Sequence, residues 1–332
     1  MKKTEADHPD VAKILAVTEK VGAATWIDSM ANIALIEPVL QGAKASGELP
    51  MFVIYDLPNR DCHANASNGE ILCEDSSCTQ GLNTYKTQYV DKVIEVFKKY
   101  PDVPIVAIVE PDSLPNLATN MSTPKCGEAE NAYKQGVAYT LKQLYALGNV
   151  TSYLDAAHGG WLGWDNNLTA VAPIFREVLN AAGGKETIRG FSTNVANYQA
   201  LGSMSSNADP CNLKSQYNFA IDEAHYINLF DNKMASSGLT GMHYITDTSR
   251  NGVTTMRNDC ANWCNIKNSG LGRRPTTEVS DLGLSNVDAL VWVKTPGESD
   301  GTSDSSSPRY DSTCTSQDAF VPSPEAGQWS ED

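Results

Sequence analysis

The chain has 332 residues, of which 41% are hydrophobic, and a formal net charge of −15 at pH 7. An α/β barrel of about 250 residues or more fits this length without a linker. The negative charge excludes nucleic acid and an anionic membrane surface as partners, because both attract a basic face. No window approaches the roughly 18 apolar residues of a membrane-spanning helix. An uncharged polar polymer is compatible with such a surface.

The eight cysteines indicate an oxidising compartment. They form an even set without the paired CxxC spacing and intervening histidines of a zinc site, so we expect four disulfides, no metal and no cofactor. The first residues, 1–9, lack the apolar stretch of a signal peptide. Four sequons agree with a secreted, extracellular glycoprotein, and they begin at Asn65, Asn120, Asn149 and Asn167.

Short β-branched or aromatic runs alternate with longer stretches of helical period. Residues 10–47 are predicted to be helical throughout and to pack against the rest. Strands are then predicted at Met51–Leu57, Pro104–Val109, Thr151–Leu154, Ile188–Ser192, Met242–Thr246 and Ala289–Val293. Helices are predicted at Tyr85–Lys99, Ala129–Leu147, Ala170–Asn180 and Gln216–Ser236. This alternation predicts an α/β barrel, with parallel strands inside and helices outside.

Polar residues follow every predicted strand. The carboxyl ends of the strands of an α/β barrel meet at one mouth, where active sites lie. A single Asp at such a position is more often a helix cap, and we prefer that interpretation for Asp56 or Asp247 alone. Helix capping does not explain why polar residues follow all the predicted strands. The other members of this set are Tyr55, Arg60, Asp61, Glu110, Asp112, Asp155, His158, Asn194, Asn197, Lys294, Glu298 and Asp300.

A cluster of carboxylates without a metal-binding motif suggests acid–base chemistry on a neutral polar substrate. Glycoside cleavage requires one carboxylic acid that protonates the departing oxygen and a second carboxylate that assists water or attacks carbon. The acid must keep its proton, so its pKa must be raised by burial or by a nearby negative charge. Asp112 is the best candidate because it follows an apolar strand, and Asp61 on a neighbouring loop supplies the second charge.

Tryptophans supply the flat apolar faces on which the C–H patches of sugar rings stack. An arbitrary tryptophan is more often a core residue than a sugar platform. Trp161 and Trp164 lie in a Gly-rich loop after His158, where there is little core to fill, and this favours sugar binding. Two further candidates are Trp263 and Trp26, of which Trp26 lies in the segment predicted to be helical.

Several longer motifs extend these observations. They are YDLPNRDC (55–62), ASNGE (66–70), EPDSLPNL (110–117), TPKC (123–126), YLDAAHGGWLGW (153–164), RGFSTNVANY (189–198), NWC (262–264) and VWVKTPGESDGTSDSSSPRYD (291–311). Together the motifs resemble glycoside hydrolase family 6, and within it the catalytic domains of fungal cellobiohydrolases. They occur in the family's order from about Trp26 to Trp329, and such long co-linear matches are highly specific.

The resemblance implies a distorted, seven-stranded parallel (β/α) barrel similar to a TIM barrel, with residues 1–332 as one catalytic domain and no binding module. It implies hydrolysis of β-1,4-glucosidic bonds in cellulose and cello-oligosaccharides, with inversion of configuration. We expect a monomer. Residues 295–329 have the long form of the last loop, which favours release of cellobiose from non-reducing ends over the open cleft of an endoglucanase.

The resemblance also assigns roles to residues that match the motifs. Asp112 corresponds to the general acid, and Asp61 raises the pKa of that acid. The base stays open between Asp300, Asp61 and a water chain held partly by Ser67. Tyr55 and Arg60 complete the catalytic set. The residues expected to bind sugars are Trp26, Trp263, Lys294 and Glu298 on the non-reducing side, and His158, Trp161, Trp164 and Asn197 on the leaving-group side. Asp155 is also expected to bind substrate.

The resemblance pairs Cys62 with Cys126 and Cys264 with Cys314, and each bond would tie an active-site loop. The other four cysteines have no counterpart in the common family pattern. We predict a local Cys73–Cys78 bond and a Cys211–Cys260 cross-link for them.

Two other classes of protein fit parts of the pattern. A non-catalytic carbohydrate-binding barrel is opposed by the joint presence of Asp112, Asp61, Ser67 and Asp300. A Schiff-base aldolase would use Lys294 at a strand end, but a binding lysine explains that residue more simply.

Overall fold

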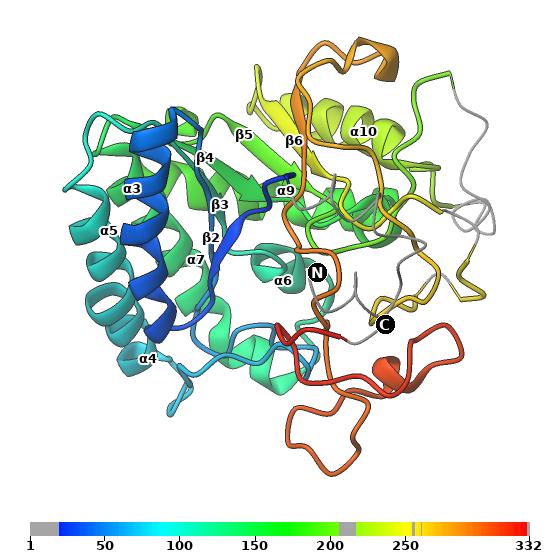
Figure 1. Cartoon of the computed structure of the whole chain (residues 1–332). Helices are drawn as coiled ribbons and strands as arrows, with labels where there is room; N and C mark the ends of the chain where they lie inside the picture. The colour runs from blue at the N-terminus through cyan, green and yellow to red at the C-terminus, as the bar shows by residue number, and fades with distance from the viewer. Residues whose placement is uncertain (1–19, 206–216, 254–255, 260, 331–332) are drawn as a thin grey trace.

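Seven parallel strands follow one another in sequence order in the computed structural model, which describes residues 20–205, 217–253, 256–259 and 261–330 (Figure 1). The two edge strands share no ladder in the described sheet, and the Ala24 N–H instead donates to the Trp292 carbonyl at 3.0 Å. The sheet is therefore a curled, incompletely closed barrel, as predicted. Its strands are β1 (Thr25–Ile27), β2 (Met51–Ile54), β3 (Ile105–Val109), β4 (Val150–Asp155), β5 (Gly190–Thr193), β6 (His243–Asp247) and β7 (Val287–Val291).

Strand β1 corrects the prediction that residues 10–47 are helical throughout. Thr25, Trp26 and Ile27 pair in parallel with β2, and the chain becomes helical only at Ala31. A three-residue strand is too short to show a period, so only its β-branched and aromatic residues indicate it. Residues 10–19 of the predicted helical segment lie outside the described residues. Trp26 consequently lies on an edge strand of the barrel.

Helices surround the sheet on its outer side, and Figure 1 shows α3 and α5 side by side next to β2. All four of the helices predicted after residue 47 are present with shifted ends, whereas α6 and α8 are too short for sequence periodicity to reveal. The described helices are α3 (Ile36–Ser46), α4 (Thr79–Thr84), the π-helical turn η2 (Tyr85–Val90), α5 (Asp91–Phe97), α6 (Ser113–Thr119), α7 (Pro124–Tyr145), α8 (Gly159–Leu162), α9 (Asp165–Ala182) and α10 (Glu223–Ser236). Single 3-10 turns occur at η1 (Ala31–Leu35), η3 (Lys185–Thr187), η5 (Ser280–Leu282) and η6 (Ser312–Thr315).

Local chemistry explains where the helices begin and end. Helix α7 starts at Pro124, whose fixed φ suits the first helical position and whose missing N–H costs nothing there. Helix α10 starts after Asp222, whose carboxylate accepts the backbone N–H of His225 at 2.9 Å. Helix α3 ends at Gly47, which takes the left-handed conformation with a φ of 74°.

The apolar residues form two layers because successive residues of a strand point to opposite faces of the sheet. On β2, Phe52 belongs to the outer cluster beneath the helices, and Val53 belongs to the inner cluster of the barrel. The inner cluster also contains Ile108, Tyr153 and Ile245. Strands buried on both faces are typical of such a sheet. The inner cluster fills the barrel and leaves its carboxyl end open for a site.

Candidate active site

A cavity of about 760 Å³ lies at the carboxyl ends of the strands. Every predicted catalytic and sugar-binding residue except Asp155 lines it. The cavity therefore brings together residues from β1 to the last loop, as the barrel arrangement requires. These residues are Trp26, Tyr55, Arg60, Asp61, Ser67, Asp112, His158, Trp161, Trp164, Asn197, Trp263, Lys294, Glu298 and Asp300.

Asp112 lies between β3 and α6, in the left-handed conformation with a φ of 61°. This conformation is uncommon for residues other than glycine and often occurs at functional sites. The Asn116 amide donates to the Asp112 carbonyl at 2.6 Å and helps to hold the turn. Burial raises the pKa of Asp112 well above its usual value, and the negative charges of Asp155 and Asp61 raise it further. These three effects favour a protonated carboxyl.

Asp155 lies behind Asp112 and does not line the cavity, unlike the sugar-binding residue that we expected. Its side chain is fully buried at the end of β4, and one carboxylate oxygen accepts the backbone N–H groups of Asp112 and Ala157, both at 3.0 Å. Burial raises the pKa of Asp155 to about 7. The prediction failed on this point because strand-end position does not distinguish a side chain that faces the cavity from one that faces its wall.

Asp61 and Ser67 form a hydrogen-bonded pair on the loop after β2, with the Ser67 hydroxyl donating to the carboxylate. Burial raises the pKa of Asp61, while the Ser67 hydrogen bond and the Arg60 charge act in the opposite direction. Arg60 shapes this loop, because its Nε donates to the Ser67 carbonyl at 2.8 Å. The Arg60 guanidinium also lies 4.4 Å from the centre of the Tyr55 ring.

Trp26, Tyr55, Lys294 and Glu298 line the cavity as a group of residues in mutual contact. The edge of one aromatic ring meets the face of the other in the Trp26–Tyr55 pair, whose ring centres are 5.5 Å apart. The Lys294 ammonium lies 5.7 Å from the Trp26 ring and 3.5 Å from the Glu298 carboxylate. This group combines apolar ring faces with charged groups that can bind hydroxyls.

His158, Trp161, Trp164 and Asn197 also line the cavity. The Trp161 indole N–H donates to the Thr119 hydroxyl at 2.9 Å, so helix α6 fixes the orientation of this ring. Burial and the Arg257 charge lower the pKa of His158 to about 3. Its imidazole is therefore neutral and suited to hydrogen bonding with a neutral ligand.

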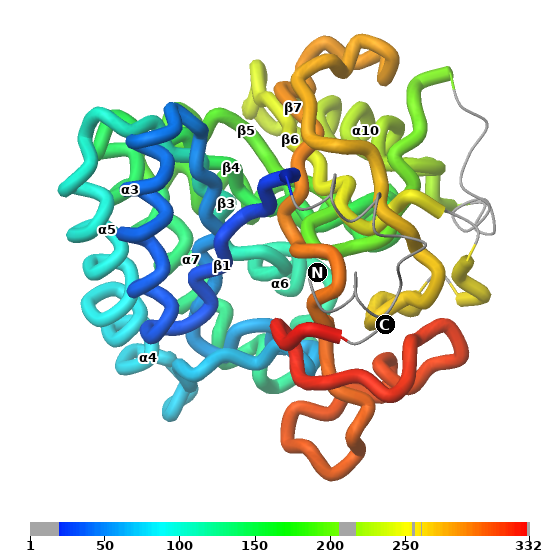
Figure 2. The backbone as a smooth tube through the Cα atoms, viewed as in Figure 1, coloured from blue at the N-terminus to red at the C-terminus, as the bar shows by residue number. Residues whose placement is uncertain are grey.

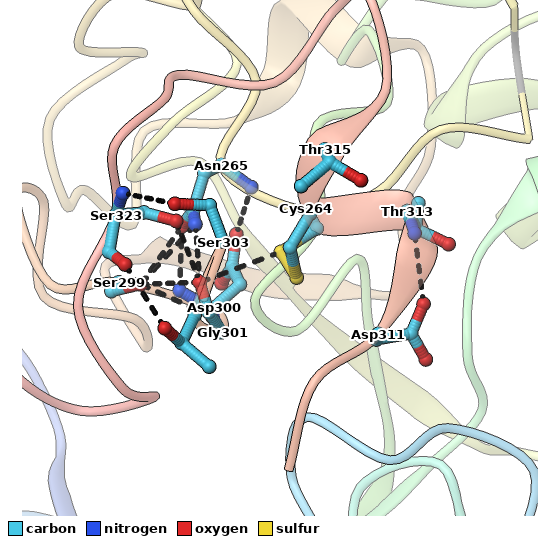
Figure 3. The surroundings of a disulfide bond; sticks show 12 residues. Cys264, Asn265, Ser299, Asp300, Gly301, Ser303, Asp311, Thr313, Thr315 and Ser323 are labelled. Atoms are coloured by element: carbon cyan, nitrogen blue, oxygen red, sulfur yellow. Dashed lines mark hydrogen bonds between the residues drawn. A yellow bond between two sulfur atoms is a disulfide. The ribbon is translucent and has the colours of Figure 1, made fainter. Parts of the chain in front are cut away.

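Asp300 is held by an ion pair that the sequence analysis did not anticipate. Arg250 Nη1 donates to its two carboxylate oxygens at 2.8 and 3.0 Å, and the Tyr198 hydroxyl donates at 2.8 Å. The Asn265 backbone N–H adds a further hydrogen bond at 2.9 Å. Figure 3 shows Asp300 and Asn265 beside the Cys264 disulfide. The carboxylate is thus engaged by three protein donors.

Asp56 and Asp247 do not line the cavity, which agrees with a structural role, but neither caps one of the described helices as we expected. Asp56 is buried, 3.6 Å from Arg60. The Asp247 carboxylate accepts backbone N–H groups from Ala196 at 3.0 Å and Lys294 at 3.1 Å, and so connects the ends of β5, β6 and β7.

Three of the four predicted disulfides are confirmed: Cys62–Cys126, Cys73–Cys78 and Cys264–Cys314. The fourth, Cys211–Cys260, lies outside the described residues. The Cys264–Cys314 bond packs against Ala66, the residue before Ser67. Within the long last loop, the Ser303 N–H donates to the Ser323 carbonyl at 3.2 Å. Among the residues with described positions, no group of His, Cys, Asp or Glu could hold a metal ion, and no helix is long and apolar enough to span a membrane.

Several residues that line the cavity were not predicted from the sequence. They include Asn116, Thr119 and Asn120 at helix α6, and the two arginines Arg257 and Arg309. Asn116 and Thr119 lie three and six residues after the Pro-Asp-Ser sequence. In a helix this spacing places them on the same side as Asp112, so the sequence could have indicated them. The arginines come from irregular segments, where no pattern indicates the direction of a side chain.

The model of the family described as Glycosyl hydrolases family 6 matches residues 1–332. Exoglucanase 3 of Agaricus bisporus is 44% identical over 325 residues, which cover 98% of this chain and 71% of the relative. The 1,4-beta-D-glucan cellobiohydrolase CEL6C of Podospora anserina is 45% identical over 312 residues, covering 93% and 74%. A relative from Fusarium oxysporum named putative endoglucanase type B is 41% identical over 324 residues, covering 96% and 67%.

Solved structures agree with this result. The catalytic core domain of the cellobiohydrolase Cel6A from Chaetomium thermophilum has a TM-score of 0.89 at 40% identity, covering 97% of this chain and 88% of that one. Cellobiohydrolase II (Cel6A) from Humicola insolens, in complex with glucose and cellotetraose, has a TM-score of 0.88 at 37% identity, with the same coverage. A match of the family model to the whole chain, together with relatives at this identity, shows that the chain belongs to family 6 of the glycosyl hydrolases.

Proposed function

We propose that this protein hydrolyses β-1,4-glucosidic bonds in cellulose and cello-oligosaccharides, with inversion, and releases cellobiose from non-reducing chain ends. The observation that carries the proposal is Asp112, a cavity-lining carboxyl whose pKa is raised by burial and by the charges of Asp155 and Asp61. Inverting glycosidases need such a protonated acid opposite a group that activates water. Family membership and the names of the relatives from Agaricus bisporus and Podospora anserina agree with this activity.

In the proposed reaction the Asp112 carboxyl donates its proton to the oxygen of the leaving sugar as the glucosidic bond breaks. Positive charge then develops on the ring that remains, and water attacks its anomeric carbon from the opposite face. The Asp61 carboxylate lies in the same cavity and would stabilise that charge electrostatically. Tyr55 lies beside Trp26 in the cavity, and its ring would press on the sugar undergoing cleavage.

The attacking water must lose a proton, and hydrogen bonding favours the Asp61–Ser67 pair over Asp300 as its route. Ser67 donates to Asp61 and keeps oxygen lone pairs that can accept from a water molecule. A proton passed through that water and Ser67 would reach the Asp61 carboxylate. The Asp300 carboxylate already accepts hydrogen bonds from Arg250, Tyr198 and the Asn265 backbone N–H, which occupy the positions from which a water molecule could donate to it.

Contact between two loops supports an enclosed passage and therefore action at chain ends. The Asn65 N–H on the Ser67 loop donates to the Asp311 carboxylate at 3.2 Å, and Figure 2 shows the C-terminal segment running beside the residue 60–70 region. A Cβ at Gly301 would lie 2.5 Å from Ala66, so these loops approach closely. An endo-acting glucanase is the alternative, as the name of the Fusarium oxysporum relative illustrates.

Product analysis on cellohexaose tests the substrate, the stereochemistry and the site of attack together. We expect cellobiose as the main product, with the newly formed reducing end appearing first as the α-anomer. Asp112→Asn should lower kcat by about 1,000-fold, because removal of a general acid costs 10²–10⁴-fold, while binding of cellohexaose persists. An initial β-anomer would contradict inversion, and unchanged kcat in Asp112→Asn would contradict the acid. A rapid loss of carboxymethylcellulose viscosity with little cellobiose would establish the endo alternative.

We also infer a secreted, monomeric protein. The three disulfides among the described residues support an oxidising compartment. The net charge of −15 supports repulsion between copies in solution. Sedimentation of the purified protein would measure its oligomeric state directly.

A further inference from the structure

Trp263 lines the cavity but lies on an irregular segment between β6 and β7. Its half-buried side chain packs against a small cluster formed by Ala66 and the Cys264–Cys314 bond. Among the described residues from 248 to 279, none belongs to a helix or to a strand of the sheet. The direction of its indole must therefore be fixed by contacts from elsewhere in the chain.

Asp318 supplies such contacts to the residues that precede Trp263. Its side chain is completely buried, with 0% exposure, and it does not line the cavity. One carboxylate oxygen accepts the Asn258 N–H at 2.9 Å, the Asp259 N–H at 3.1 Å and the Asn262 amide at 2.7 Å. The other oxygen accepts the Asn258 amide at 2.7 Å. All four donors come from the turn directly before Trp263.

The backbone around Asp318 binds the residues that follow Trp263. The Lys267 N–H donates to the Asp318 carbonyl at 3.0 Å, and the Phe320 N–H donates to the Asn265 carbonyl at 2.7 Å. Ile266 and Ala319 form an isolated antiparallel bridge between these two bonds. Residues 318–320 consequently hold the chain on both sides of the Trp263 indole.

We infer that Asp318 is a positioning residue, which holds the Trp263 indole in the cavity as a platform for a glucosyl ring. This inference rests on the proposed function, in which Trp263 binds sugars. Hydrogen bonds to an ionised carboxylate are about twice as strong as neutral ones, so four of them define the turn well. Burial alone would raise the pKa of Asp318, but the hydrogen bonds from Asn262, Asp259 and Asn258 lower it to about 2. The carboxylate thus stays ionised at mildly acidic pH.

A double-mutant cycle tests the inference. Asp318→Asn replaces one acceptor oxygen with a donor that faces the Asn258 amide, so the turn should lose its geometry. We expect Asp318→Asn and Trp263→Ala each to raise KM for cellohexaose about 10-fold, and the double variant to match Trp263→Ala within about twofold, because residues that act as a unit are not additive. A general loss of stability would lower the Tm of Asp318→Asn and of the double variant. It would not explain why Asp318→Asn raises KM in the parent but leaves KM unchanged when Trp263 is already replaced by alanine.

Asp304→Asn is the matched control. Asp304 lies on the same C-terminal segment, is exposed, and accepts the Ser306 N–H at 2.9 Å within its own turn. Its replacement should leave KM unchanged. If Asp318→Asn fails to fold, Asn262→Ala removes one donor and keeps the carboxylate, with an expected rise in KM of about threefold that again disappears in the Trp263→Ala background.

The possible failures are distinguishable. Unchanged KM in Trp263→Ala would overturn the sugar-binding role of Trp263 and hence that part of the proposed function. A raised KM in Trp263→Ala with normal KM in Asp318→Asn and Asn262→Ala would overturn the positioning role. A further 10-fold rise when Asp318→Asn is added to Trp263→Ala would show that Asp318 acts elsewhere.

Discussion

Three carboxyl groups line the proposed cleavage point, and each has different partners. The Asp112 carboxyl has a pKa raised by burial and by two neighbouring charges. The Asp61 carboxylate accepts from the Ser67 hydroxyl, and the Asp300 carboxylate is paired with Arg250. Residues of one chemical type thereby acquire separate roles, which is the usual way in which a protein performs acid and base chemistry at one pH.

Asp155→Asn tests the electrostatic support of Asp112, because Asp155 does not line the cavity. A general acid acts in its protonated form, so the rate falls as pH rises through its pKa. Loss of the Asp155 charge should lower the pKa of Asp112 and move the alkaline limb of kcat/KM to lower pH, by an amount of the order of one unit. The measurement is a pH profile on cellohexaose. An alkaline limb that stays in place would contradict this role.

At the scale of elements, irregular loops rather than strands supply many of the residues that line the cavity. Disulfides tie these loops together. The Cys264–Cys314 bond joins residues 50 positions apart and packs against Ala66 beside Ser67. The Cys73–Cys78 bond joins residues only 5 positions apart, and neither cysteine lines the cavity. The first bond should therefore affect both stability and catalysis, and the second should affect mainly local stability.

Replacement of each pair by serine separates these effects. Chain-entropy arguments give about 4 kcal/mol for loss of the Cys264–Cys314 bond and about 2 kcal/mol for loss of the Cys73–Cys78 bond. The free energy of unfolding is measured by denaturant titration, and kcat on cellohexaose is measured below the transition. We expect kcat to fall only in the Cys264→Ser, Cys314→Ser variant. Equal loss of kcat in both variants would argue against the contact with Ala66 as the cause.

Across the whole molecule, the two ends of the barrel have different functions. The carboxyl end holds the cavity, while at the opposite end Asp288 pairs with Arg189 at 2.6 Å and with His243 at 3.0 Å. The Tyr153 hydroxyl also donates to Asp288 at 2.6 Å. These residues connect β4, β6 and β7 and the residue that precedes β5. In α/β barrels this end serves stability.

Asp288→Asn should lower the free energy of unfolding by about 1–2 kcal/mol at neutral pH, since hydrogen bonds to charged groups contribute this much, and leave kcat/KM unchanged. Burial opposes ionisation of Asp288, but its hydrogen bonds to Arg189 and Tyr153 prevail and lower its pKa. A depressed pKa stabilises the fold fully above the unfolded value of about 3.9, and this contribution is lost as pH falls through the lowered pKa of the folded state. Unfolding measured at pH 7 and pH 3 should show a smaller difference from the parent at pH 3 than at pH 7. A difference that is as large at pH 3 as at pH 7 would contradict the electrostatic origin.

Sequence patterns predicted the later part of the barrel more accurately than its start. Strands β2 to β7 are bounded by polar turns and buried on both faces, so each appears as a short apolar run. Strand β1 has three residues and was missed, and with it the true position of Trp26. The strand ends correctly indicated Asp112, Asp61 and Lys294 as residues of one cavity, because parallel strands direct their carboxyl ends to the same side.

Contacts between segments that are distant in the sequence determine the features of the site that local patterns did not predict. Asp300 meets Arg250 across 50 residues, and Asp318 meets Asn262 across 56. Asp155 lies 43 residues from Asp112 and turns toward its backbone instead of the cavity. A local pattern reports which residues are polar and which element they follow, since propensity and period are properties of neighbours in the chain. The partner of a buried charge is chosen only when the barrel closes around it, because the cost of an unpaired charge depends on the burial that the complete fold creates.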